Sequence, residues 1–216
     1  MAIKNKRILI TAGPTWVPID SVRVIGNIAT GKTGILLAER LKNLGAKVTL
    51  LLGPVEACCL SKNIRLIRFK YFDDLKNTVL KELRSKKYDI VIHSAAVSDY
   101  KPLKIYYHKI KSNIKNWRLN LVPTEKIIDL IRKIDYSLFL VGFKFELGIN
   151  KKILINRARS MMSHARLNLG VANTIDKNRY QAYIINQNKT YGPLFNRNDL
   201  TKKLIKIITS YELRGY

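Results

Sequence analysis

Cysteine is nearly absent from this chain: Cys58 and Cys59 are the only two among 216 residues, and they are adjacent. Neighbouring cysteines rarely bridge each other, so a disulfide framework and a cysteine-based metal knuckle are both excluded. Neither thiol has a partnering base nearby in the sequence, and we expect both to be inert. This usage is typical of a protein kept in a reduced, cytoplasmic setting.

Long apolar runs are also missing. No stretch approaches the ~18–20 apolar residues of a membrane-spanning helix, and the N-terminus, MAIKNKRILITAG, has no extended apolar segment. Hydrophobic residues nevertheless make up 47% of the chain, which is too many for a disordered polymer. The composition therefore predicts a soluble, folded protein that does not associate with membranes.

Acidic residues are scarce: 15 Asp and Glu accompany 40 Lys and Arg, for a net charge of +25. Such a balance favours anionic partners. The cations are scattered along the chain, Lys exceeds Arg, and Ile and Asn are frequent, which is the bias expected from an A+T-rich genome. Stacking aromatics near clustered lysines are limited to Tyr106, Tyr107 and Trp117. The charge therefore favours small anionic substrates, and a basic nucleic-acid-binding module stays an alternative.

Short apolar runs alternate with segments of helical periodicity. Strands are predicted at 7–11, 47–52, 64–69, 89–94, 138–143 and 169–172, and helices at 31–44, 72–85, 125–133, 151–166 and 198–211. The alternation predicts an α/β fold with a Rossmann-like, doubly wound, mostly parallel sheet, in a single domain over residues 1–216. Such sheets bind ligands beyond the carboxyl ends of their strands.

Two stretches interrupt the alternation. Residues 105–122 are extended and rich in lysine, and they predict a long β arm or hairpin projecting from the domain. Residues 180–195 predict a second hairpin that turns around 186–189.

Residues 26–33, GNIATGKT, match the P-loop pattern G-x-x-x-x-G-K-[ST]. In that site backbone N–H groups wrap a phosphate, the lysine reaches the terminal phosphates and the final hydroxyl holds Mg²⁺. The obvious strand, 7–11, ends well before the motif, and no apolar strand ends in an Asp for the metal. A P-loop hydrolase or kinase is therefore an alternative, although a helix beginning at Gly31–Lys32 favours anions in any case.

A longer series of motifs resembles phosphopantothenate–cysteine ligases, the family of the DNA/pantothenate metabolism flavoprotein C-terminal domain. In order, the motifs are ILITAGPTWVPIDSVRVIGNIATGKTG at 8–34, HSAAVSDYKP at 93–102, KIKS at 109–112, VPTEKII at 122–128, VGFKFE at 141–146 and VAN at 171–173. The segment HSAAVSDY and the sequence of the predicted helix after VGFKFE resemble the stand-alone members of the family more than the fused ones.

The resemblance implies a two-step ligation in coenzyme A biosynthesis. The carboxylate of 4′-phosphopantothenate attacks the α-phosphate of CTP, with ATP as the alternative, and pyrophosphate leaves. The amine of L-cysteine then attacks the acyl-nucleotidylate. Two steps are needed because an unactivated carboxylate is a poor acyl donor. Mg²⁺ is the implied metal, with no direct ligand assigned and Asp99 as the candidate, and no flavin is expected.

The resemblance also implies residue roles. Asn27 corresponds to a catalytic amide that would bond the acyl carbonyl, and Lys109 to a catalytic lysine on the triphosphate, assisted by Lys111. Substrate binding falls to Arg23, Asn27, Ala29 and Thr30. The nucleotide site would include Gly13, Ser94, Ala95, Asp99, Lys109, Glu125, Lys126, Ile127, Ile128 and Phe143.

Each role has a structural alternative. Asn27 could be a turn residue, Asp99 a helix cap, Phe143 an ordinary core residue and Arg23 a solvated cation. His93 has no second ligand at metal-binding spacing and is interpreted as a partly buried structural histidine.

Two departures from the family pattern leave questions open. Thr124-Glu125-Lys126 replaces the common Asn-Pro-Asp, which leaves CTP over ATP undecided. A difference in length from the family pattern makes the alignment of the helix at 151–166 uncertain in register. Its basic candidates for binding phosphate are Arg157, Arg159 and Arg166.

The family usually forms homodimers whose arms cross, and the extended segment 105–122 is consistent with that, because an isolated arm is marginal in water. A separate phosphopantothenoylcysteine decarboxylase is a further implied partner. No segment is left for a flavin-binding decarboxylase within the chain.

Overall fold

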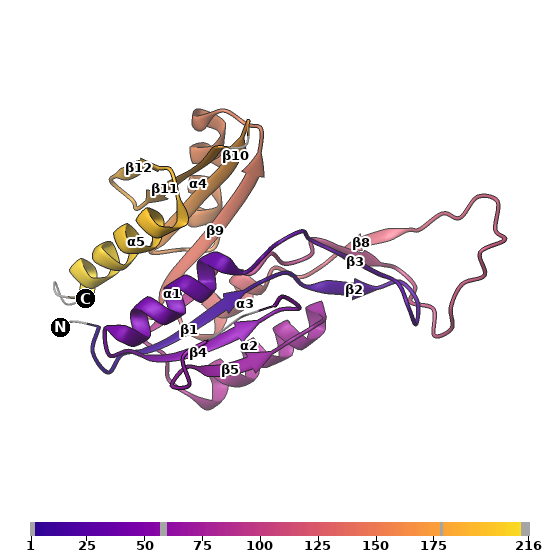
Figure 1. Cartoon of the computed structure of the whole chain (residues 1–216), viewed down its shortest axis with the longest axis horizontal. Helices are drawn as coiled ribbons and strands as arrows, with labels where there is room; N and C mark the ends of the chain where they lie inside the picture. The colour runs from indigo at the N-terminus through magenta and orange to yellow at the C-terminus, as the bar shows by residue number, and fades with distance from the viewer. Residues whose placement is uncertain (1–2, 57–59, 178, 213–216) are drawn as a thin grey trace.

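An eight-stranded sheet forms the centre of the computed structural model, which describes residues 3–56, 60–177 and 179–212 (Figure 1). Its order is β12-β11-β10-β9-β6-β1-β4-β5. The strands are β1 (Arg7–Ala12), β4 (Lys47–Leu52), β5 (Arg65–Arg68), β6 (Ile90–His93), β9 (Phe139–Leu147), β10 (Leu169–Asp176), β11 (Arg179–Ile185) and β12 (Thr190–Leu194). The strands from β5 to β10 pair in parallel, and β11 and β12 are antiparallel additions. This confirms the predicted doubly wound α/β fold.

Helices cover both faces of the sheet (Figure 1). They are α1 (Lys32–Asn43) and α5 (Arg197–Glu212) on one face, and α2 (Phe72–Ser85), α3 (Ile127–Ile134) and α4 (Lys151–His164) on the other. Alternate residues of β1 enter the two cores: Ile8 packs with α1 and Leu9 with α2 and α3. A strand buried on both faces has a continuous apolar sequence, which is why β1 was recognisable.

The predicted helices agree closely with those observed. Helix α2 has the predicted limits, and Gly45 follows α1 with φ 87°, as a C′ glycine does. Strands β9 and β10 continue past their apolar runs because they pair with each other as far as Leu147 and Ile175. No described helix is long and apolar enough to cross a membrane. The predicted inert pair Cys58 and Cys59 lies outside the described residues.

The arm is built differently from the prediction. Strands β7 (Tyr100–Pro102) and β8 (Leu121–Pro123) form a short ribbon, and β2 (Trp16–Pro18) with β3 (Val24–Gly26) forms another (Figure 1). Residues 103–120 contain no strand, so the prediction of a β arm along 105–122 is wrong for most of its length. Instead of a ladder, part of this loop bonds to the β2–β3 turn: the N–H of Tyr106 donates to the carbonyl of Ile19 at 2.9 Å.

Asp20 ties the arm to that turn. Its Oδ1 accepts the N–H groups of Val22 (2.9 Å) and Arg23 (2.8 Å), and its Oδ2 accepts the Arg23 guanidinium (2.9 Å) and the Ile110 N–H (3.1 Å). Burial raises the pKa of Asp20, but these donors outweigh it and hold the pKa below its usual value. Arg23 also lies 5.7 Å from the ring centroid of Trp117. One buried carboxylate therefore fixes how the arm leaves the body.

Replacing Asp20 should release the arm without unfolding the domain. Asp20→Asn removes the ion pair with Arg23 and leaves an amide N–H facing donors, so the loop loses charge-assisted bonds. We expect hydrogen exchange of the Ile110 amide to speed up about tenfold or more. The exposed Asp176→Asn is the matched control. Unchanged exchange at Ile110 in Asp20→Asn would contradict the assigned role.

Candidate active site at the carboxyl edge of the sheet

The chain leaves β1 toward β4 and later returns to β6 on the other side of β1. In doubly wound sheets ligands bind where successive crossovers diverge in this way. Gly13 follows β1 and Ser94 follows β6 at this point. The site predicted from the motifs therefore has its first residues at the switch point of the sheet.

Two loops run side by side above the switch point. The Gly13 carbonyl accepts the Ala96 N–H at 2.9 Å, and the Thr15 N–H donates to the Ala96 carbonyl at 3.1 Å. Ser98 donates its N–H to Thr15 Oγ1 (2.8 Å) and its hydroxyl to the Thr15 carbonyl (3.1 Å), and both residues are buried. These two loops, residues 13–15 and 96–98, therefore form a fixed surface beneath the site, which we call the floor.

Gly13 is required by the geometry of this floor. Its φ is +82°, and a Cβ there would lie 3.1 Å from the backbone nitrogen of Gly53. A side chain would therefore strain the backbone and crowd the neighbouring turn.

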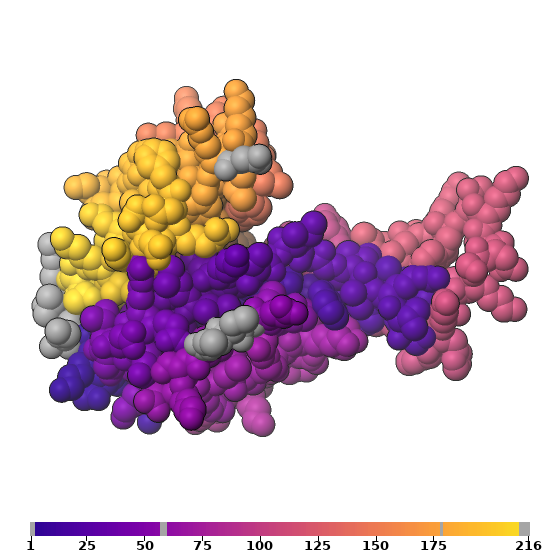
Figure 2. Space-filling view, viewed as in Figure 1, coloured from indigo at the N-terminus to yellow at the C-terminus, as the bar shows by residue number. Residues whose placement is uncertain are grey.

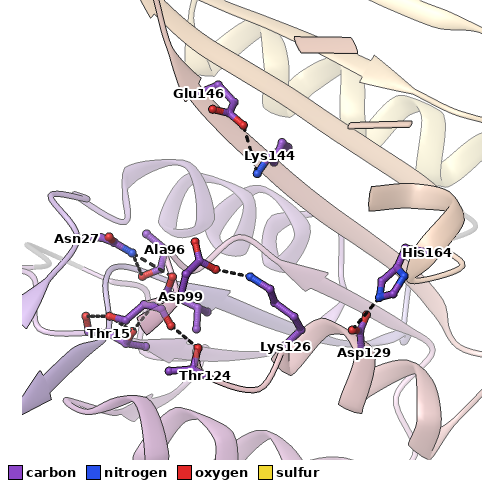
Figure 3. A network of polar contacts seen from close by, with 12 residues as sticks. Thr15, Asn27, Ala96, Asp99, Thr124, Lys126, Asp129, Lys144, Glu146 and His164 are labelled. Atoms are coloured by element: carbon purple, nitrogen blue, oxygen red, sulfur yellow. Dashed lines mark hydrogen bonds and ion pairs between the residues drawn. The ribbon is translucent and has the colours of Figure 1, made fainter. Parts of the chain in front are cut away.

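Asn27 reaches across to the floor from the segment after β3 (Figure 3). Its Nδ2 donates to the carbonyls of Ala96 (3.1 Å) and Val97 (3.0 Å). Because both acceptors are carbonyl oxygens, the orientation of the amide is fixed and Oδ1 is left as the outward atom. The exposed Asn27 therefore offers a ligand a hydrogen-bond acceptor.

The start of α1 stands beside the same floor. Its N-cap, Gly31, has φ 67°, and a Cβ at Gly31 would lie 3.3 Å from the backbone nitrogen of Gly13. No acidic side chain occupies the first turn of α1. Its free N–H groups and dipole favour an anion there. Ala29 and the exposed Thr30 link this helix to Asn27.

The context of the P-loop pattern counts against that alternative. Residues 26–33 begin at the last residue of β3, which pairs with β2 in a ribbon separate from the central sheet. A P-loop instead passes from a strand of the central sheet straight into its helix. Lys32 is exposed at the first position of α1.

Asp99 and Lys126 form an ion pair above the floor (Figure 3). Thr124 fixes the backbone beside them: its N–H donates to the Asp99 carbonyl at 2.9 Å and its hydroxyl to the Ser98 carbonyl at 2.6 Å. Both charged groups are exposed, and exposed pairs contribute little to stability. A charged ligand could therefore replace either partner at small cost.

At the start of α3, the groups available to a ligand are mainly those of the backbone. Ile127 is buried in the core and Ile128 packs against the same cluster. Glu125 is held by Lys76 of α2, and this hydrogen bond lowers the pKa of Glu125.

Strand β9, with Lys144 and Glu146, passes above Asp99 and Lys126 in this view (Figure 3). Phe143 is half-buried against the core under α1 and α5. Glu146 pairs with Lys144 (3.3 Å) and with Arg157 of α4 (3.0 Å); burial raises its pKa, and the two cations outweigh this and lower it. Arg157 is therefore already neutralised by the protein.

The structure gathers Gly13, Asn27, Ser94, Ala95, Asp99 and Lys126 but not the predicted residues of the arm. Lys109 precedes Ile110, which is bonded to Asp20 at the β2–β3 turn, and the arm carries it away from the sheet (Figure 1). Arg23 is held by Asp20. Neither joins Asn27 within this chain.

His93 is structural, as predicted, although it is more buried than expected. Its Nδ1 lies 2.9 Å from Thr11 Oγ1, and burial lowers its pKa to about 4. No three His, Cys, Asp or Glu gather as a metal site in the part of the chain that the structure describes. A single carboxylate such as Asp99 would be enough for a Mg²⁺ ion that arrives on phosphates, since such ions need one or two protein carboxylates.

Comparison with known proteins agrees with this geometry. The sequence profile of the DNA/pantothenate metabolism flavoprotein C-terminal domain matches residues 3–211. The chain belongs to this family.

Two curated relatives carry the name coenzyme A biosynthesis bifunctional protein CoaBC. The one from Thermococcus kodakarensis is 38% identical over 174 residues, which are 81% of this chain and 42% of the relative. The one from Borreliella burgdorferi is 33% identical over 213 residues, which are 95% of this chain and 53% of the relative. The chain therefore spans about half the length of these proteins.

A solved member of the flavoprotein family has the same fold. The crystal structure of the DNA/pantothenate metabolism flavoprotein from Streptococcus pneumoniae superimposes with a TM-score of 0.86 at 26% identity, covering 95% of this chain and 99% of that one.

Sequence reasoning missed the residues that hold the site in place. Thr15, Ser98 and Thr124 lie inside the quoted motifs but bond to backbone groups far away in the sequence. Asp20 lies in the Ile-Asp-x-Val-Arg stretch at residues 19–23 of the first motif. This stretch is the feature of the sequence that could have pointed to its role.

Proposed function

We propose that this domain is a phosphopantothenate–cysteine ligase that activates the carboxylate of 4′-phosphopantothenate with CTP, or with ATP, and couples it to L-cysteine. Family membership and the CoaBC relatives support a role in coenzyme A biosynthesis. The observation that carries the proposal is the anchored amide of Asn27 beside the N-terminus of α1 at the switch point.

In the first step, a carboxylate oxygen of phosphopantothenate attacks the α-phosphorus, the P–O bond to the β-phosphate breaks, and pyrophosphate leaves. The N–H groups at the start of α1 would stabilise the negative charge on the phosphates. Lys126, once released from Asp99, would add a positive charge that binds the nucleotide. Asp99 is then the candidate carboxylate for Mg²⁺ carried by the phosphates.

In the second step, the neutral amine of cysteine attacks the acyl carbon and the nucleoside monophosphate leaves. The amine must shed a proton as the C–N bond forms, and the leaving nucleoside monophosphate can accept it. Asn27 Oδ1, the outward atom of the anchored amide, suits an N–H of this amine better than it suits the acyl carbonyl, which itself needs a donor. Asn27 would thus orient the attacking nitrogen.

Pyrophosphate release by the purified chain tests the proposal. Release with Mg²⁺ and CTP or ATP should require 4′-phosphopantothenate, and cysteine should then convert the intermediate to product. The ratio of the two nucleotides decides base preference, which Thr124-Glu125-Lys126 leaves open. Phosphate release independent of phosphopantothenate would instead favour the P-loop alternative.

A homodimer is part of the proposal. Exposed large apolar side chains gather on the β2–β3 turn and the arm, which stands out from the body (Figure 2): Val22, Leu103, Ile105, Tyr107, Ile114 and Trp117. An apolar surface of this kind marks an interaction site. A partner's arm would bring its Lys109 to the candidate site beside Asn27, which this chain's own Lys109 does not reach. Light scattering should therefore report a dimer, and a monomer with full activity would refute this.

Other partners stay proposals as well. The relatives are bifunctional and about twice as long as the matched region, which supports a decarboxylase acting with this domain. The absence of a flavin is still a prediction. Nucleic-acid binding is the weaker alternative, and a steep loss of duplex affinity with salt would be its signature.

A further inference from the structure

A second hollow, of about 900 Å³, lies at the opposite, amino edge of the sheet. It is bounded by the end of α4, the turn between β11 and β12, and the second half of α5. The turn reaches this edge because Ile185 pairs with Gly170, at the start of β10. The hollow is therefore separated by the length of the sheet from the candidate site beside Asn27.

Four cations line this hollow: Arg159 and Arg166 from α4 and the residues after it, and Lys203 and Lys206 from α5. No carboxylate is among its described lining residues, and none of the four pairs with a carboxylate in the described part of the chain.

Neutral groups contact three of these cations, Arg166 among them. Arg159 donates to Thr190 Oγ1 at 3.1 Å, and Lys203 lies 5.2 Å from the ring centroid of Tyr191. Arg157, on the same helix as Arg159, is by contrast neutralised by Glu146. The charge of Arg159 is therefore not balanced by a carboxylate, whereas that of Arg157 on the same helix is.

Arg166 holds a backbone conformation that arginine does not favour. It follows the C-cap of α4, Ala165, and has φ 50°. Glycine or asparagine usually occupies this left-handed position, because a larger side chain is strained there. Its guanidinium stands 5.7 Å from the ring centroid of Tyr136. Arginine thus occupies a position at which glycine would adopt the same backbone conformation with less strain.

The rest of the lining is polar and partly fixed. Asn186 Nδ2 donates to the hydroxyl of Tyr211 at 2.8 Å, and Asn186 Oδ1 accepts the N–H groups of Asn188 (3.0 Å) and Lys189 (2.6 Å). These bonds set the shape of the β11–β12 turn before any ligand arrives. Amides and hydroxyls of this kind can bond oxygens of a ligand.

We propose that this hollow binds a small molecule that carries two or three phosphate groups, at a site separate from the candidate site beside Asn27. Guanidinium groups match phosphate oxygens in two-pronged hydrogen bonds, and a polyanion would relieve the repulsion among four unpaired cations. The volume falls within the range of small-ligand pockets. The inference does not depend on the proposed ligase activity, because its measurements are of binding.

Inorganic tripolyphosphate is the probe for the full chain. Hydrogen exchange with saturating probe should show protection in peptides covering 186–191 and 203–211, in addition to any at 13–31 and 94–99. Protection confined to the carboxyl edge, or none, would overturn the proposal. So would a single-stranded oligonucleotide that protects the same peptides at lower concentration, since that would indicate a nucleic-acid surface.

Arg166→Asn is the decisive variant, because asparagine tolerates the left-handed backbone and carries no charge. We expect its affinity for tripolyphosphate at the amino edge to fall about tenfold or more, with a melting temperature equal to or above that of the original chain. Lys206→Gln, at an exposed position, should weaken binding in the same direction. The variant Lys81→Gln removes the same single charge from the exposed face of α2 and should not weaken binding. Equal losses in all three would show a general charge effect and refute the site.

Discussion

The substitution Asn27→Asp is expected to reduce formation of 4′-phosphopantothenoylcysteine by about 10²–10³-fold while pyrophosphate release continues. The amide of Asn27 donates to two carbonyl oxygens, at 3.1 and 3.0 Å. A carboxylate has no N–H to donate, and these oxygens would repel it from the floor. The side chain would lose its position at the step in which the amine attacks, and the acyl-nucleotidylate should accumulate.

The measurement is a single-turnover assay that follows pyrophosphate and product separately. Asn77→Asp, the same chemical change on the exposed face of α2, is the matched control and should retain both steps. The P-loop alternative expects the reverse pattern, in which Lys32→Ala abolishes nucleotide binding and Asn27→Asp is silent. Equal loss of both steps in Asn27→Asp would show that the residue supports binding generally and does not act in the second step.

The substitution Glu82→Ala is expected to lower the free energy of unfolding by about 3 kcal/mol at pH 7. Glu82 is 4% exposed on α2 and accepts bonds from Arg65 (3.0 Å) and the Tyr88 hydroxyl (2.6 Å). Burial raises its pKa, but these donors and Lys86 lower it to about 2. For a domain of this size the loss corresponds to a melting temperature about 6–12 °C lower.

The pH dependence of the same variant gives a second readout. Because the folded pKa of Glu82 lies below its ordinary value of 4.5, the stability it provides is complete above pH 4.5 and is lost as the pH falls toward 2. The shift corresponds to about 3 kcal/mol at most. Urea unfolding at several pH values should show the original chain and Glu82→Ala converging below pH 4.5. Asp176→Ala, at an exposed position, should stay parallel to the original chain, and parallel curves for Glu82→Ala would contradict the assignment.

Much of the fold followed from local sequence. Strands such as β1 and β6 are buried on both faces and therefore have continuous apolar sequences, and α2 has apolar residues at helical spacing. Glu82 was not predicted to be buried, because its partners Arg65 and Tyr88 lie on other elements. The arm was mispredicted because the ladder ends at its base, where the Leu103 N–H donates to the Asn120 carbonyl. Further along, the N–H groups of Tyr106 and Ile110 donate to the β2–β3 turn, which local patterning does not reveal.

By itself, the sequence determined the alternation of strands and helices, and it predicted the carboxyl edge of the sheet as the binding edge and Asn27 as the residue to test. Each depends on periodicity or on motifs that neighbouring residues carry. Only the tertiary structure decided which atom of Asn27 faces outward, that Asp20 holds the arm, and that Arg166 meets three other cations at the far edge of the sheet. These features depend on contacts between residues tens of positions apart, and such contacts are set by how the elements pack and not by the order of residues within any one of them.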